Sequence, residues 1–162
     1  MNKALLVIDV QNDYFPGGAY PLWNAEAALD NVVEAIAKAT SEGIPVILIQ
    51  HIAEGPAPFF NEGTPGVRIH PRILAAAPQA PVVVKHHADA FHQTTLERTL
   101  RDLGVTELVV AGMMTQNCVT HTAISRAAEP YQVTVLGDCC ATASQLLHLV
   151  ALKALSIRVK VS

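Results

Sequence analysis

Cysteine, charged residues and aromatic residues are all scarce in this 162-residue chain. The three cysteines are an odd number without paired spacing, so we expect no disulfide framework and a reducing, cytoplasmic location. Acidic residues outnumber basic ones by 14 to 11, which leaves no basic face for nucleic acid. No apolar run is long enough to cross a bilayer, and the N-terminus is typical of a strand rather than a signal peptide. We therefore expect neither a nucleic acid nor a membrane as partner.

Apolar residues are abundant, at 51% of the chain, and their spacing alternates between strand and helix patterns. The length fits a single domain, residues 1–162, with a full core. A connection rich in proline and glycine runs from about 51 to 81, and loops of this length are often functional. Strands are predicted at 4–8, 46–49, 82–84, 108–111, 132–136 and 157–161, and helices at 25–40, 94–103, 119–128 and 145–155.

This alternation predicts an α/β fold of three layers, with a parallel, Rossmann-like sheet between helices. In such a sheet the binding crevice lies beyond the carboxyl ends of the strands. Asp9, Lys85 and the Gly112 turn before Cys118 each follow a predicted strand. We therefore expect three side chains that are distant in sequence to meet in one crevice.

Cys118 is the candidate nucleophile, because it stands at a helix start after a buried strand and a glycine turn. Unpaired N–H groups and partial positive charge at such a position favour a thiolate. Lys85 would add a full positive charge, and Asp9 could accept the thiol proton and later protonate a leaving amine. Backbone N–H groups of the turn 114–118 would stabilise a tetrahedral oxyanion.

Plain structural interpretations remain for each of these residues. A cysteine after a strand is often inert core, Asp9 could be a turn residue, and Lys85 could be a solvated strand end. His121, on the first turn of the same helix, offers a second constellation, a papain-like Cys/His pair. Cys139 and Cys140 are adjacent in sequence and suit core packing better than a zinc or redox pair.

Several histidines lie on or near the predicted strand ends, so a metal site is conceivable. No carboxylate accompanies His51 at the tight spacing of a strand-borne metal pair, because Ile49 occupies that place, and we expect no metal. Phe59 and Phe60, in the long connection, either cover an apolar substrate or anchor the loop. The histidines in question are His51, His70, His86, His87 and His92, of which His86 and His87 are expected to shape the pocket or face solvent.

Three segments carry a recognisable pattern in a fixed order. They are Asp-Val-Gln-Asn-Asp-Tyr-Phe at 9–15, Lys85 with Asp-Ala-Phe at 89–91, and Gly-Met-Met-Thr-Gln-Asn-Cys-Val at 112–119. Together they resemble the isochorismatase-like cysteine hydrolase family, and the resemblance runs from Leu5 to about Thr142. It implies a six-stranded parallel sheet, a catalytic triad of Asp9, Lys85 and Cys118, and a cis peptide between Met113 and Met114. That peptide would bring the N–H groups of Met114 and Cys118 together as an oxyanion hole.

The resemblance favours a metal-free, streptothricin-hydrolase-like subgroup. Nicotinamidases of the family carry an Asp-x-His metal motif after the second strand, where this chain has Ile49-Gln50-His51. The implied reaction cleaves a C–N bond of a small amide or lactam through a thioester on Cys118, without a cofactor or metal. A homo-oligomer, dimer or tetramer, is also implied.

Two alternatives remain at this point: vinyl-ether hydrolysis with Asp9 as the acid, and a non-catalytic binding protein on the same fold. Substrate contacts are predicted for Gln11, Phe15, Phe59, Phe60, His87 and Phe91.

Overall fold

A six-stranded parallel sheet forms the centre of the computed structural model, which describes residues 2–162. The spatial order is β3-β2-β1-β4-β5-β6, and every neighbouring pair is parallel. The α/β class and the six-stranded parallel sheet are thus confirmed. The strands are β1 (Lys3–Ile8), β2 (Val46–His51), β3 (Val82–Lys85), β4 (Glu107–Met113), β5 (Gln132–Ala141) and β6 (Lys160–Val161).

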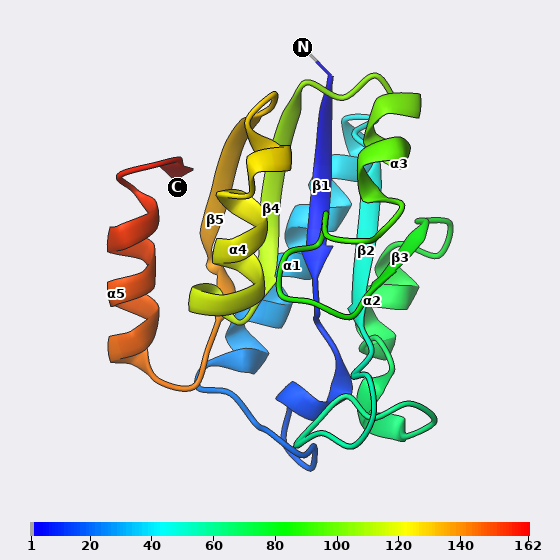
Figure 1. Ribbon diagram of the computed structural model, residues 1–162, viewed down its shortest axis with the longest axis vertical. Helices are drawn as coiled ribbons and strands as arrows, with labels where there is room; N and C mark the ends of the chain where they lie inside the picture. Colours follow the sequence, from blue (N-terminus) through cyan, green and yellow to red (C-terminus); the bar gives the residue numbers. More distant parts are fainter. Residues whose placement is uncertain (1) are drawn as a thin grey trace.

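Helices cover both faces of the sheet, as Figure 1 shows. Because alternate side chains of a strand point to opposite faces, β1 contributes Leu5 and Val7 to one apolar core and Leu6 and Ile8 to the other. None of the helices in the described part of the chain is long and apolar enough to cross a bilayer. The first face carries α1 (Ala25–Ser41) and α2 (Pro71–Ala76), and the second carries α3 (Leu96–Asp102), α4 (Thr120–Ala123) and α5 (Gln145–Leu155).

The carboxyl ends of the strands meet at one edge of the sheet, the lower edge in Figure 1. Asp9 directly follows β1, while His51 and Lys85 end β2 and β3 and pair with each other in register. Gly112 of β4 pairs with Ile8 and has a φ of 127°. A Cβ atom there would overlap the Ile8 carbonyl, so glycine allows β1 and β4 to approach closely just before Asp9.

The predicted helix at 119–128 is wrong in its second half. Helix α4 ends at Ala123, and a separate 3₁₀ turn, η4 (Arg126–Ala128), follows. Ser125 separates the two, because its Oγ accepts the Ala127 N–H and donates to Asp89 Oδ2 at 2.7 Å. A serine inside an apolar helical pattern was the only sequence signal for this break.

Two short elements are not predicted from the sequence, and two strands differ from their predicted bounds. Helix α2 lies within the long connection and begins at Pro71, a favourable first helical residue, after His70 as its cap. A 3₁₀ turn, η2 (Pro65–Val67), lies in the same connection. Strand β5 continues five residues beyond the predicted end at 136, to Ala141, after a register shift against β4. Strand β6 comprises only Lys160–Val161.

Candidate active site

The carboxylate of Asp9 lies at the centre of the edge formed by the strand ends. Its backbone adopts a left-handed φ of 52° and its side chain is fully buried. Such backbone geometry is uncommon outside glycine and clusters at functional sites. Oδ2 is in ion-pair contact with Lys85 Nζ at 2.9 Å, whereas Oδ1 has no hydrogen-bond partner among residues 2–162. One oxygen of a buried carboxylate is therefore left for a proton or a ligand.

The Lys85 ammonium lies among four acceptor atoms from different parts of the chain. It is fully buried, and its Nζ lies 2.9 Å from Asp9 Oδ2, 3.2 Å from Cys118 Sγ, 2.8 Å from His51 Nδ1 and 2.9 Å from the His87 carbonyl oxygen. Burial alone lowers the pKa of Lys85, but the Asp9 carboxylate and Cys118 outweigh it and leave the pKa raised. The surroundings of Lys85 therefore favour its charged, ammonium form.

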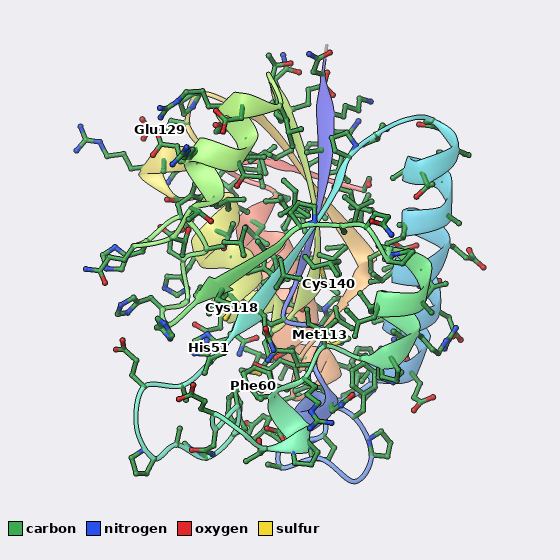
Figure 2. All side chains as sticks on the ribbon, turned by 90° about the vertical axis from the view of Figure 1, so that its right-hand side faces the viewer. His51, Phe60, Met113, Cys118, Glu129 and Cys140 are labelled. Atoms are coloured by element: carbon green, nitrogen blue, oxygen red, sulfur yellow. The ribbon has the colours of Figure 1, made fainter. Side chains whose placement is uncertain are left out.

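Cys118 reaches the same cluster from η3 (Thr115–Val119), a π-helical turn that leads into α4. Only 3% of the residue is exposed. Figure 2 shows it beside His51 near the carboxyl ends of the strands. The structure thus brings Asp9, Lys85 and Cys118 together, as the resemblance implies, although their catalytic roles stay a prediction.

Two effects in the structure oppose the Cys118 thiolate that the helix-start position predicts. Burial raises the pKa of the Cys118 thiol, the Asp9 carboxylate raises it further, and the Lys85 ammonium opposes them only in part. A thiolate beside an ionised Asp9 would give this buried site a net negative charge. Burial and Asp9 thus favour a neutral Cys118 thiol at rest, whereas the helix start and Lys85 favour the thiolate.

Gln11 holds the end of β2 in place. Its fully buried side chain donates from Nε2 to the His51 carbonyl at 2.9 Å and to the Val67 carbonyl at 2.7 Å. Its Oε1 accepts the His51 N–H at 2.8 Å. The amide of Gln11, predicted to contact substrate, is thus engaged by three backbone groups and fixes the position of His51.

The phenylalanines predicted to contact substrate lie mainly in the core. Phe15 packs against the ring of His70 with centroids 4.6 Å apart. Phe60 is 1% exposed, and its N–H donates to Asp13 Oδ2 at 2.7 Å, so it anchors the long connection. Phe59 packs edge-on against Phe60 at 5.0 Å and is the more exposed of the two.

Phe91 and His87 have different neighbours. Phe91 stacks on Tyr131, which precedes β5 at the opposite, amino edge of the sheet. His87 is exposed, packs its ring against His92, and reaches Lys85 only through its carbonyl. Contact with substrate stays a prediction for all six residues, and the geometry favours His87 over Phe91.

The alternative Cys/His pair is contradicted by the position of His121. Its ring is exposed, and Nδ1 is bonded to the Asn117 carbonyl at 2.9 Å rather than to sulfur. The peptide between Met113 and Met114 is cis. The oxyanion-hole role of the Met114 and Cys118 N–H groups stays a prediction.

A metal ion bound by Asp9, His51 and Cys118 would have to displace the Lys85 ammonium. Asp9, His51 and Cys118 each offer one such atom, and these atoms lie within 4.8 Å of one another. Lys85 Nζ contacts all three residues, so the ammonium fills the space between their ligand atoms. Ile49, at the aspartate position of the nicotinamidase motif, is apolar and buried. The residues present therefore do not fit that metal site.

His51 is a functional candidate whose contact with Lys85 the sequence does not predict. The sequence offers it only as a conceivable metal ligand, whereas its Nδ1 lies 2.8 Å from Lys85 Nζ. Burial and the Lys85 charge lower the pKa of His51 to about 4, against an opposing effect of Asp9. The available signal was that His51 and Lys85 both end neighbouring strands.

Comparison with known proteins gives concordant results. The sequence profile of the isochorismatase domain matches residues 3–161. An uncharacterized isochorismatase family protein of Bacillus subtilis is 43% identical over 88% of this chain and 79% of its own length. A maleamate amidohydrolase of Pseudomonas putida is 30% identical over 84% of this chain and 70% of its own. An isochorismatase-like hydrolase of Alkaliphilus metalliredigens superposes with a TM-score of 0.91 at 26% identity, over 100% of this chain and 94% of that one.

Proposed function

Because this chain belongs to the isochorismatase family of hydrolases, we propose that it cleaves a C–N bond of a small amide or lactam through a thioester on Cys118. The observation that carries the proposal is the placement of a buried thiol and a buried carboxylate on one ammonium, with Sγ and Oδ2 3.2 Å and 2.9 Å from Nζ. These three groups are a nucleophile, a base and a fixed positive charge.

In the first half-reaction Asp9 takes the Cys118 proton as sulfur attacks the carbonyl carbon. A C–S bond forms, and the C=O π electrons move to the oxygen, where the Met114 and Cys118 N–H groups hold the oxyanion. Collapse re-forms the C=O bond and breaks the C–N bond, while Asp9 gives its proton to the departing nitrogen. Lys85 stays an ammonium throughout and stabilises the negative charge on sulfur and Asp9.

In the second half-reaction the Asp9 carboxylate takes a proton from water. The resulting hydroxide attacks the thioester, the C–S bond breaks, and the departing thiolate recovers the proton from Asp9. The unpaired Oδ1 suits this role, because a buried carboxylate oxygen without a partner is free to exchange a proton. The products are a carboxylic acid and an amine or ammonia, and the site returns to its resting charge.

Vinyl-ether hydrolysis remains the second candidate, since Asp9 could protonate an ether without a nucleophilic thiol. Cys118→Ala separates the two: it abolishes amide hydrolysis but spares an ether hydrolase that relies on Asp9. A purely binding role is disfavoured by the complete Asp9, Lys85 and Cys118 set. The proposal also includes a single domain over 1–162, a cytoplasmic location, no cofactor and a homo-oligomeric assembly.

The test is a panel of small primary amides and lactams, with ammonia release and intact-protein mass recorded together. We expect at least one compound to be hydrolysed and, after rapid acid quenching, to add its acyl mass to the peptide that contains Cys118. The matched control is Cys118→Ala, which should show neither signal. Hydrolysis by Cys118→Ala at a rate within a few-fold of wild type would refute the thioester route.

A further inference from the structure

The ring of His51 has one nitrogen committed to Lys85 and one that is free. Lys85 is an ammonium and can only donate, so Nδ1, at 2.8 Å from Nζ, must be the acceptor. The ring is neutral near pH 7, because its pKa is lowered to about 4. A neutral imidazole that accepts at Nδ1 carries its hydrogen on Nε2. The Lys85 contact therefore fixes the tautomer.

The Nε2–H donor of His51 is accessible from outside. Nε2 has no hydrogen-bond partner among residues 2–162, and the only buried unpaired side-chain oxygens or nitrogens in that range belong to Asp9. An unpaired Nε2 outside that buried set has at least some exposed surface. His51 is half-buried, with Nδ1 on the Lys85 ammonium.

The position of His51 is unusually well determined for a strand end. The Gln11 amide holds its backbone N–H and carbonyl, and the Phe60 ring lies 5.9 Å from its own. Figure 2 shows Phe60 next to His51 and below Cys118. A donor whose backbone is held by Gln11 and whose ring is held at Nδ1 by Lys85 is preorganised to recognise an acceptor.

We propose that the Nε2–H group of His51 is the recognition donor of the site, binding a second hydrogen-bond acceptor on the amide substrate. This inference deepens the proposed function and rests on it. A ring nitrogen of His51 and Cys118 Sγ are at most 4.8 Å apart, and β1, which Asp9 follows, lies between β2, which carries His51, and β4, which precedes the turn with Cys118. The acceptor is therefore a few bonds from the carbonyl carbon under attack and distinct from the scissile oxygen. Either a carboxylate or an aromatic ring nitrogen supplies this chemistry.

The test measures the binding of matched amides to a Cys118→Ala variant, which cannot turn them over. Nicotinamide is compared with benzamide, which lacks the ring nitrogen, and succinamate with butyramide, which lacks the carboxylate. We expect the acceptor-bearing member of at least one pair to bind more tightly, by about 2- to 12-fold for a neutral acceptor or about 10- to 150-fold for a carboxylate. The pair that responds identifies the acceptor.

Two substitutions of His51 in that background separate recognition from positioning. His51→Asn keeps an acceptor oxygen near the Nδ1 position but lacks a donor at Nε2, and it should abolish the preference within the pair. His51→Gln keeps a distal donor and should restore part of it. A preference that persists in His51→Asn, equal binding within both pairs, or no measurable binding of any of the four amides would overturn the inference.

Nitrogen-15 NMR of the wild-type imidazole tests the inference without any variant. The expected signal is a neutral ring with hydrogen on Nε2, and a proton on Nδ1 near pH 7 would overturn it. Failure of the proposed function gives a different result from failure of this inference. In that case the matched amides bind to Cys118→Ala as expected, but wild-type protein forms no acyl adduct on Cys118.

Discussion

Asp9→Asn should make Cys118 more reactive towards alkylating reagents even though it removes the proposed base. The Asp9 carboxylate raises the pKa of the Cys118 thiol, while Lys85 lowers it. The substitution keeps the shape of the side chain and removes the negative charge, so a Cys118 thiolate would face only the Lys85 ammonium. Amide hydrolysis should be lost in the same variant, because no group remains to move the proton.

The size of the effect follows from the distance between the two groups. The Asp9 and Cys118 ligand atoms are at most 4.8 Å apart, which at an effective dielectric constant near 20 corresponds to about 3.5 kcal/mol of repulsion. This is about 2.5 units of pKa. A thiolate of lower pKa is a weaker nucleophile, with a Brønsted coefficient of about 0.4–0.5, so the alkylation rate should rise by about 25-fold.

The assay is iodoacetamide labelling near pH 7, followed by peptide mass spectrometry of Cys118. Cys139 and Cys140 are internal controls, because Asp9 does not contribute to the pKa of either, and their labelling should be unchanged. Lys85→Met should change the rate in the opposite direction. An Asp9→Asn protein that alkylates at the wild-type rate or more slowly would refute the claim that the Asp9 charge raises the pKa of Cys118.

Three further outcomes are expected. Lys85→Ala should bind Co²⁺, because the ammonium no longer fills the space between Asp9, His51 and Cys118. Absorption spectroscopy should then show a thiolate-to-cobalt charge-transfer band, and the same band in wild-type protein would contradict this. Gln11→Ala should lower the free energy of unfolding by about 2–5 kcal/mol, since it leaves three backbone groups unpaired. Denaturant unfolding measures this loss, and a negligible loss would contradict the role given to Gln11. Lowering the pH from about 6.5 towards 4 should reduce stability, because the unfolded chain protonates His51 first; a melting temperature that stays level across this range would argue against a neutral buried ring.

The strand ends were predictable because parallel sheets obey a simple rule. Apolar runs before Asp9, Lys85 and Gly112 identify three strands, and the carboxyl ends of parallel strands share one edge. The convergence of Asp9, Lys85 and Cys118 therefore followed from the pattern and the family resemblance together. The break of a helix at Ser125 did not, since it depends on a tertiary contact with Asp89.

The protonation of the site could not be predicted from sequence. A helix start and a nearby lysine lower a thiol pKa, but burial and a carboxylate raise it, and only the structure shows how closely these groups approach. The same holds for His51 and Gln11. Their roles depend on which backbone groups and which ring nitrogen face them, and spacing along the chain carries no such information.

Competition between water and hydroxylamine tests the central claim most directly. Amides, anilides and esters that share one acyl group should all give the same ratio of hydroxamate to carboxylic acid, because each must pass through the same acyl group on Cys118 before the nucleophiles compete. A ratio that varies with the leaving group would show that water attacks the substrate itself, and the thioester account of this site would be contradicted.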